Sequence, residues 1–295
     1  MWTSKALMKS LQKQKTMDAY RDFLGLGIAG NFALHLAQAG ELEDFKEIIT
    51  ADEAAPKGMF PFYLPKRVTG AKEVLNTYPL SSSTIKLPNE NLNIQAEPEV
   101  ALICDFLYEN NKLSKIIPTH FAAYNDCSIR VAGASKISDK KNWGENSKGV
   151  SQNLLEIDNF GDGGIMDNYS ICSFLKRGEG IHAYGEDVEL KGYSYFYEKL
   201  LDWMVEQINT QVDFGPLEHL SSYIAACNFP TKAIISIGAT RYTPYGEHTF
   251  LREGDEIIIM LYNNMTTHPQ SLLKMVEENS SLPQDTSILR QKVCL

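Results

Sequence analysis

The stretch that decides the fold is Glu-Pro-Glu-Val-Ala-Leu-Ile-Cys-Asp-Phe-Leu-Tyr, residues 97–108. From Glu99 onward it is an apolar run ending at polar residues 109–112, which predicts a buried strand that enters a hairpin. Glu97 and Glu99 are separated by one residue on extended backbone, so their side chains leave the same face of the strand. Two like charges held together are unfavourable unless a cation or a shared proton compensates them, which indicates a hard-metal site with oxygen ligands. The competing interpretation is a solvated edge strand, which Pro98 favours because proline cannot donate to a ladder.

A second polar segment, Asn-Asp-Cys-Ser-Ile-Arg at 125–130, is followed by Trp143 and by Ser-Lys-Gly at 147–149. With these segments the chain resembles the fumarylacetoacetate hydrolase superfamily. Members of that family carry a Glu-x-Glu pair, then a segment like Asn-Asp-Val-Ser-Ala-Arg-Asp, then a Trp and a Lys-containing loop. The matching order and spacing make this a more specific signal than any single motif.

The resemblance implies a site of five residues. Glu97, Glu99 and Asp126 match the family's ligands for one divalent metal ion, and we expect Mg²⁺ or Mn²⁺ here. Arg130 and Lys148 match the residues that contact substrate in the family. We therefore expect these two cations to hold a carboxylate or an enolate oxygen.

Two further segments, 27–35 near the front and 235–255 near the back, extend the resemblance over roughly residues 24–262. In the back segment the family's Gly-Thr-Pro turn is altered, at 238–241, which disfavours hydrolysis. Residues 27–35 match a front segment that ends in a histidine, here His35. In the hydrolytic members this histidine is paired with a glutamate that helps it to activate water. The expected glutamate position is occupied by Gln38, and a neutral amide cannot take up a proton, which disfavours hydrolysis. Glu41, one helical turn further, is an alternative partner.

The fold implied by the resemblance is α+β, a mixed β-sandwich roll usually assembled as a homodimer. We expect an N-terminal extension at 1–16, a single catalytic domain at 17–265 and a C-terminal tail at 266–295. Local patterns predict a helix that Asn31 caps and that runs to Ala39. The remaining expected elements are short strands at 22–30, 60–64, 83–87, 233–237 and 256–262, a sheet continuation at 116–131, an amphipathic helix at 195–208, and a loop at 135–164 that closes over the site.

Two other interpretations remain open. Gly25-x-Gly27-x-x-Gly30 formally matches a dinucleotide-binding fingerprint, which would suggest an NAD(P)-binding oxidoreductase. The preceding segment is short and charged, and no acidic residue follows a second apolar strand at the expected distance, so this interpretation is disfavoured. The other is a catalytically inactive binding protein with the same fold, which Gln38 motivates.

Composition limits the partners. The formal net charge of -9 disfavours a nucleic-acid-binding surface. No stretch approaches the ~20 apolar residues of a membrane span, and the N-terminal lysines lack the apolar region of a signal peptide. The five cysteines form no Cys-x-x-Cys pair and are expected to be reduced thiols. We therefore expect a cytoplasmic protein that does not bind membranes.

Together these features predict a divalent-metal-dependent hydrolase or lyase whose substrate is a small carboxylate, either a 2-oxo acid or a 1,3-dicarbonyl compound. The expected reaction is hydrolysis of a carbon–carbon bond, decarboxylation or tautomerisation through a metal-stabilised enolate. His35 is expected to position water or shuttle a proton.

Overall fold

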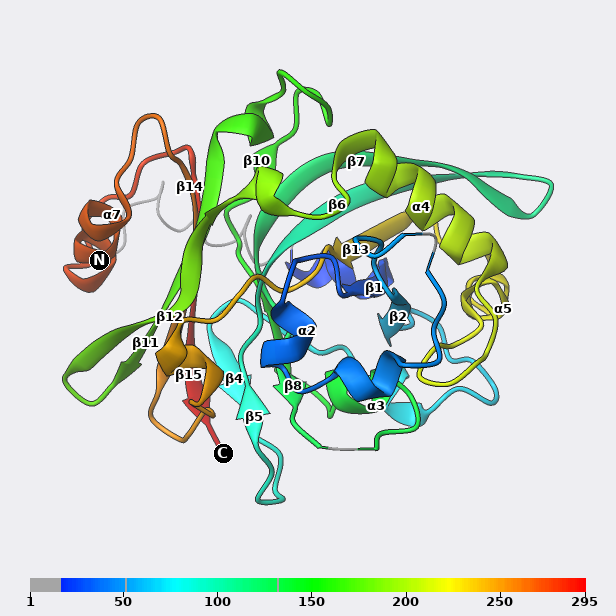
Figure 1. Cartoon of the computed structure of the whole chain (residues 1–295), viewed down its shortest axis with the longest axis horizontal. Helices are drawn as coiled ribbons and strands as arrows, with labels where there is room; N and C mark the ends of the chain where they lie inside the picture. The colour runs from blue at the N-terminus through cyan, green and yellow to red at the C-terminus, as the bar shows by residue number, and fades with distance from the viewer. Residues whose placement is uncertain (1–16, 51, 132) are drawn as a thin grey trace.

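The computed structural model describes residues 17–50, 52–131 and 133–295, so the expected N-terminal extension at 1–16 lies outside the described residues. Two curled sheets form the body of the protein (Figure 1). Strand β6 (Pro98–Glu109) and strand β7 (Lys112–Asn125) make a long antiparallel hairpin at the centre of the larger sheet. The eight-stranded sheet has the order β2 (Gly58–Tyr63), β1 (Leu24–Ala29), β13 (Lys232–Ser236), β6, β7, β9 (Lys148–Val150) and β3 (Leu80–Ser81), with β10 (Leu155–Glu156) also paired to β7.

The second sheet has five strands. Its order is β12 (Gly180–Glu189), β11 (Tyr169–Arg177), β14 (Glu256–Asn263), β15 (Thr286–Cys294) and β4 (Thr84–Lys86). A separate two-stranded ladder joins β5 (Ile94–Gln95) to β8 (Ser128–Ile129). This ladder brackets the segments that carry the predicted site, because β5 precedes Glu97 and β8 follows Asp126.

Neighbouring side chains of a strand contribute to apolar clusters on opposite faces of the sheet. On β6, Val100 and Leu102 belong to the largest apolar cluster, which also contains residues of the second sheet such as Ile257 and Ile259. Ala101 belongs to a different cluster on the other face of β6. Successive side chains of a strand point to opposite faces, so the apolar run predicted from residue 99 is buried on both sides.

Six α-helices flank the sheets in the described part of the chain. Helix α4 (Tyr197–Thr210) and α5 (Leu220–Ala226) lie together beside the larger sheet, where α4 contacts β7 and both contact β2 (Figure 1). The others are α2 (His35–Gln38), α3 (Ser138–Lys141), α6 (Pro244–Glu247) and α7 (Pro269–Glu277). None of these helices, within the ranges given above, is long and apolar enough to cross a membrane.

Residues 266–295, expected to be a C-terminal tail, are part of the fold. They contain α7 and β15, and β15 lies between β14 and β4 in the second sheet. Helix α7 packs Leu272 and Val276 on the outer face of that sheet. The strand is hard to see in the sequence because three of its buried residues, Thr286, Ser287 and Gln291, are polar.

The helix predicted from Asn31 to Ala39 is wrong in its length, because only His35–Gln38 is helical. Asn31 does not cap it. Its side-chain amide donates to the carbonyl oxygens of Tyr195 and Ile237, and its Oδ1 accepts from the Tyr195 amide. These partners lie 164 and 206 residues away along the chain, so tertiary contacts outweigh the local capping preference.

The glycines of the apparent dinucleotide fingerprint serve packing. A Cβ on Gly25 would lie 2.3 Å from the Phe62 ring, and one on Gly27 would lie 2.3 Å from the Phe60 ring. Both rings come from β2, which pairs with β1 antiparallel rather than as the next parallel strand of a dinucleotide-binding unit. The glycines therefore admit two aromatic rings, and the structure gives no support to the oxidoreductase interpretation.

Candidate metal centre

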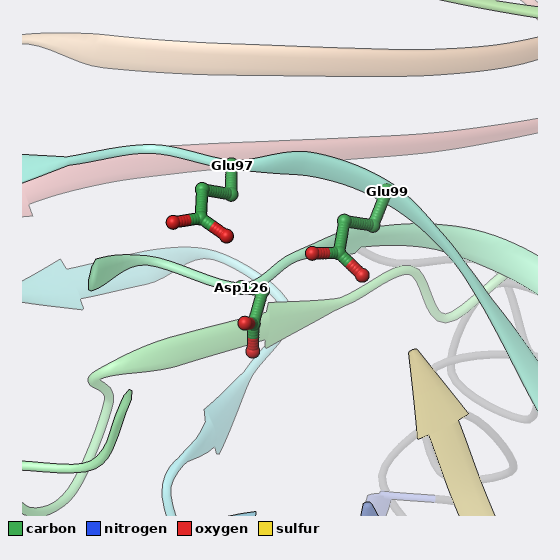
Figure 2. A group of neighbouring side chains, drawn as sticks. All are labelled: Glu97, Glu99 and Asp126. Carbon is green, nitrogen blue, oxygen red and sulfur yellow. The ribbon is translucent and has the colours of Figure 1, made fainter. Parts of the chain in front are cut away.

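The hairpin β6–β7 brings the three predicted metal ligands together. Glu97 directly precedes β6, Glu99 is the second residue of that strand, and Asp126 directly follows the end of β7. The Asp126 amide donates to the Glu97 carbonyl oxygen at 3.0 Å, which continues the pairing of the two strands. The three side chains lie close together, and one oxygen atom of each carboxylate lies within 4.8 Å of the others (Figure 2).

The three carboxylates are buried. Their residues are 3%, 2% and 0% exposed, and β6 lies between β13 and β7 rather than at a sheet edge. The solvated-edge interpretation of the Glu-x-Glu pair is therefore wrong. Pro98 is tolerated because it is the first residue of the strand.

Within the part of the chain that the structure describes, three cations face these carboxylates. Lys141 Nζ lies 2.6 Å from Glu97 Oε2 and 2.7 Å from Asp126 Oδ2. Lys148 forms a short ion pair with Asp126 Oδ1, and Arg130 Nη2 lies 2.8 Å from Glu97 Oε1. Burial would raise the pKa of Glu97, but Lys141 and Arg130 outweigh it and hold this pKa well below its usual range.

Glu99 differs from its neighbours because no ion pair reaches it from the described residues. Its Oε2 accepts one hydrogen bond, from the Gly238 amide at 3.0 Å. Burial raises the pKa of Glu99 well above its usual range, and the nearby Asp126 and Glu97 raise it further. The surroundings therefore disfavour the ionised form of this carboxyl, and a divalent ion bound beside it would favour that form.

The carboxylate set fits a hard divalent ion. Glu97 Oε1 and Asp126 Oδ2 are buried and accept no hydrogen bond, although each faces a cation. Buried polar atoms of this kind are rare and call for a partner. Oxygen-only donors at this separation are the ligands that Mg²⁺ and Mn²⁺ take.

Arg130, predicted to contact substrate, is almost fully engaged by the protein itself. Its guanidinium donates to Gln95 at 2.6 Å, to Glu41 at 2.8 Å and to the Tyr242 hydroxyl at 3.0 Å, in addition to the Glu97 pair. Its side chain is 9% exposed. In this arrangement Arg130 positions Glu97.

His35 lies at the same site, 4% exposed, with its ring centroid 5.2 Å from that of Tyr242. Its Nδ1 has no hydrogen-bond partner. Burial lowers the pKa of His35 to about 4, so the imidazole is neutral at pH 7.

Neither expected partner of His35 acts as its hydrogen-bonded carboxylate. Gln38 instead binds the main chain of Tyr242, donating to its carbonyl oxygen at 3.1 Å and accepting from its amide at 2.9 Å. Glu41 pairs with Arg130 and Lys140. The histidine–carboxylate dyad of the hydrolytic family members is therefore absent among these described residues.

Gln291 of the second sheet supports the site through Asn125, the last residue of β7. Asn125 is fully buried, accepts from the Glu97 amide at 3.1 Å and donates to Gln291 of β15 at 3.0 Å. Gln291 also donates to the Lys148 carbonyl oxygen at 3.3 Å. It lies so close to Gly149 that a Cβ there would be 2.3 Å from the Gln291 amide group.

A surface cavity of about 560 Å³ borders the charged cluster and is lined in part by Glu41, Arg130 and Lys140. The metal ligands do not line it. In this structure the cavity therefore exposes the outer rim of the cluster, and the carboxylate site itself is closed.

Lys141 is the site residue that sequence reasoning missed. It lies in the loop expected to cover the site, 135–164, which also supplies Lys148. The pair Lys140-Lys141 reads as a solvated loop, yet both are buried, at 3% and 4% exposed. The available signal was electrostatic, since three buried carboxylates require compensation by nearby cations.

Comparison with known proteins identifies the fold. The model of a family described as "Family of unknown function (DUF5718)" matches residues 41–293. No curated protein matches the chain in sequence. Among solved structures, a yeast fumarylacetoacetate hydrolase family protein matches with a TM-score of 0.54 at 12% identity, over 94% of this chain and 95% of that one.

Two further solved structures agree. A putative fumarylacetoacetate hydrolase family protein from Yersinia pestis matches with a TM-score of 0.50 at 13% identity, covering 92% of this chain and 93% of the other. A 2-keto-3-deoxy-D-arabinonate dehydratase complexed with magnesium and 2,5-dioxopentanoate matches with a TM-score of 0.51 at 13% identity, over 92% of this chain and 73% of that one. The predicted fold, α+β of the fumarylacetoacetate hydrolase type, is confirmed.

Proposed function

Since this chain belongs to the family described as DUF5718 and has the fumarylacetoacetate hydrolase fold, we propose that it is a divalent-metal-dependent enzyme acting on a small 2-oxo acid or 1,3-dicarbonyl compound. The observation that carries the proposal is Glu99. It is a buried carboxylate with no cation of its own, one of three whose oxygens lie within 4.8 Å. A buried, unpaired carboxylate is costly, and a cation bound by all three would remove that cost.

Glu97, Glu99 and Asp126 would hold Mg²⁺ or Mn²⁺. When bound, the ion supplies Lewis-acid polarisation of a substrate carbonyl group. The dehydratase of the same fold was solved with magnesium and with 2,5-dioxopentanoate, a 2-oxo acid, which supports this pairing of metal and substrate class. We propose a small carboxylate as the substrate, with Lys148 as the cation that orients it and Arg130 as the residue that positions Glu97.

The reaction we favour is decarboxylation or tautomerisation rather than hydrolysis. Hydrolysis needs a base that activates water, and His35 lacks a carboxylate partner because Gln38 binds the main chain of Tyr242. A neutral, buried imidazole can still accept a proton from a substrate carbon or return one to it. We assign His35 this proton-shuttle role.

A catalytically inactive binding protein is the second candidate. Its support is Arg130, whose donors are taken up by Gln95, Glu41, Tyr242 and Glu97. We also propose a cytoplasmic homodimer, which size-exclusion chromatography with light scattering would test.

The deciding experiment measures Mn²⁺ binding by titration calorimetry and turnover of a panel of acylpyruvates and oxaloacetate. We expect one bound ion per chain and loss of oxaloacetate with little acylpyruvate cleavage. Glu99→Gln should reduce metal affinity at least tenfold, because a neutral amide is a poorer ligand than a carboxylate.

The matched control is Glu218→Gln. Glu218 is another buried glutamate, 3% exposed, whose pKa is raised to about 7 by burial, and it belongs to no part of the carboxylate site. Its replacement should leave metal binding unchanged. Undiminished metal binding in Glu99→Gln would overturn the site assignment, and metal binding without turnover of any panel member would favour the binding protein.

A further inference from the structure

We propose that Lys141 is an internal cation of the carboxylate site and that a divalent ion binds by displacing its ammonium group. This inference rests on the proposed metal site and adds a residue that sets its affinity. Lys141 Nζ lies 2.6 Å from Glu97 Oε2 and 2.7 Å from Asp126 Oδ2. It therefore bridges two of the three carboxylates that would hold the metal.

The ammonium and a metal ion compete for the same oxygens. A nitrogen less than 3 Å from both carboxylates occupies the space between them, and Mg²⁺ requires oxygen distances of about 2.0–2.1 Å. Two cations held that close in a buried site would repel each other strongly. Metal binding therefore requires Lys141 Nζ to leave.

Lys141 satisfies the site only in part, so it can be displaced. Its contact with Glu97 is a hydrogen bond, but its contact with Asp126 Oδ2 is an ion pair without hydrogen-bond geometry. Glu99 receives no cation at all from the described residues. A divalent ion that bound all three carboxylates would satisfy groups that the lysine leaves unmatched.

The balance of charges favours a divalent ion that replaces the Lys141 ammonium over one that binds beside it. Among the described residues the cluster holds five carboxylates and four cations, namely Glu41, Asp44, Glu97, Glu99 and Asp126 with Arg130, Lys140, Lys141 and Lys148. Adding a divalent ion to this set would leave one uncompensated positive charge. Moving the Lys141 ammonium away from the ligands would leave the five carboxylates balanced by the ion and the three remaining cations.

Lys141 also has an aromatic neighbour outside the carboxylate site. Lys141 ends α3, a single helical turn without a side-chain cap, and its stem has four rotatable carbons. Its Nζ already lies 5.4 Å from the centroid of the Phe60 ring. Aromatic faces attract ammonium groups at this separation, so movement toward the ring keeps a favourable contact.

The test compares Mn²⁺ and Mg²⁺ affinities of the wild type, Lys141→Met and Lys140→Met by titration calorimetry. Methionine keeps most of the lysine stem and removes its charge. Lys140 is the matched control, because it lies on the same helix, is equally buried, and pairs with Glu41 and Asp44 instead of the metal ligands. We expect Lys141→Met to bind metal at least tenfold more tightly than the wild type, and Lys140→Met to stay within about threefold.

A second readout follows α3 in the wild type. Hydrogen exchange of residues 138–142 should become faster when Mn²⁺ is added, since the helix loses its anchor. Without metal, Lys141→Met should melt roughly 5–10 °C below the wild type, because Glu97 and Asp126 each lose one of their cations. Adding Mn²⁺ should restore the melting temperature. If Lys141→Met folds only when Mn²⁺ is present, that result equally supports the proposal.

A failure of the proposed displacement can be distinguished from a failure of the proposed function. Metal binding that is equally tight in the wild type and Lys141→Met, or tighter in the wild type, overturns the displacement and leaves the proposed function standing. The absence of metal binding in every variant overturns the proposed function, and the displacement with it. If Lys141→Met does not fold even with Mn²⁺, Lys141→Gln is measured instead, and a wild-type affinity in that variant overturns the displacement.

Discussion

At the scale of single residues, His35 shows how burial sets chemical behaviour. Its imidazole is enclosed beside Tyr242, with Nδ1 unpaired, and its pKa falls to about 4 from an ordinary value of 6.5. The unfolded chain therefore binds a proton at a pH where the folded protein does not. The free energy of unfolding then decreases as the pH falls below about 6.5, with the full loss reached below about 4.

We predict that the wild type loses about 2–3 kcal/mol more stability than His35→Gln between pH 7 and pH 4.5. Glutamine does not titrate, so the difference between the two proteins isolates the histidine from the carboxyl groups. Urea unfolding at both pH values measures it. Equal losses in the two proteins would show that His35 is protonated in the folded state.

Gly25 makes a second prediction at this scale. An added Cβ would lie 2.3 Å from the Phe62 ring, so Gly25→Ala should destabilise the protein by about 1–3 kcal/mol. Combining it with Phe62→Leu should recover part of this loss by removing the ring. Chemical denaturation of both single variants and the double variant gives the coupling. Additive effects would mean that the ring and the glycine do not interact.

At the scale of elements, β15 connects the second sheet to the site. It pairs with β14 and β4, and its Gln291 binds Asn125 and the Lys148 main chain. We predict that a chain ending at Asp285 does not unfold cooperatively, because β14 loses its partner and Asn125 its acceptor. Thermal unfolding followed by circular dichroism tests this, and a sharp transition near the wild-type temperature would contradict it.

The opposite end of the chain provides the control. A chain beginning at Met17 should fold and melt as the full-length protein does. It keeps the described contacts of this end, including the bond from the Tyr78 hydroxyl to the Met17 carbonyl oxygen.

Comparison of these elements with the sequence shows which features local patterns can predict. The strand from residue 99, the helix predicted at 195–208 and the shared face of Glu97 and Glu99 follow from spacing, because strand and helix periodicity are local. The family resemblance places Asp126 beside them. Asn31, Lys141 and Gln291 could not be placed. Each is polar and sits in an unremarkable local pattern, and each takes its role from partners distant in the sequence.

At the scale of the whole molecule, metal binding and folding stability are linked. A ligand that binds only the folded state stabilises it by about 2.7 kcal/mol at a free concentration one hundred times its Kd. We predict that Mn²⁺ at this excess raises the melting temperature by several degrees relative to protein treated with a chelator. Glu99→Gln should lose this increase. A melting temperature that does not respond to metal would argue against the carboxylate site.

The hydrogen bond between Asn125 and Gln291 has a consequence for the folding of the chain during its synthesis. Asn125 orients Glu97, and its own acceptor, Gln291, is synthesised 166 residues later. A nascent chain in which both strands of the β6–β7 hairpin have been synthesised therefore lacks the Gln291 support of its carboxylate site until β15 has been synthesised. The support of Glu97 by Asn125 can therefore be completed only after β15 has left the ribosome.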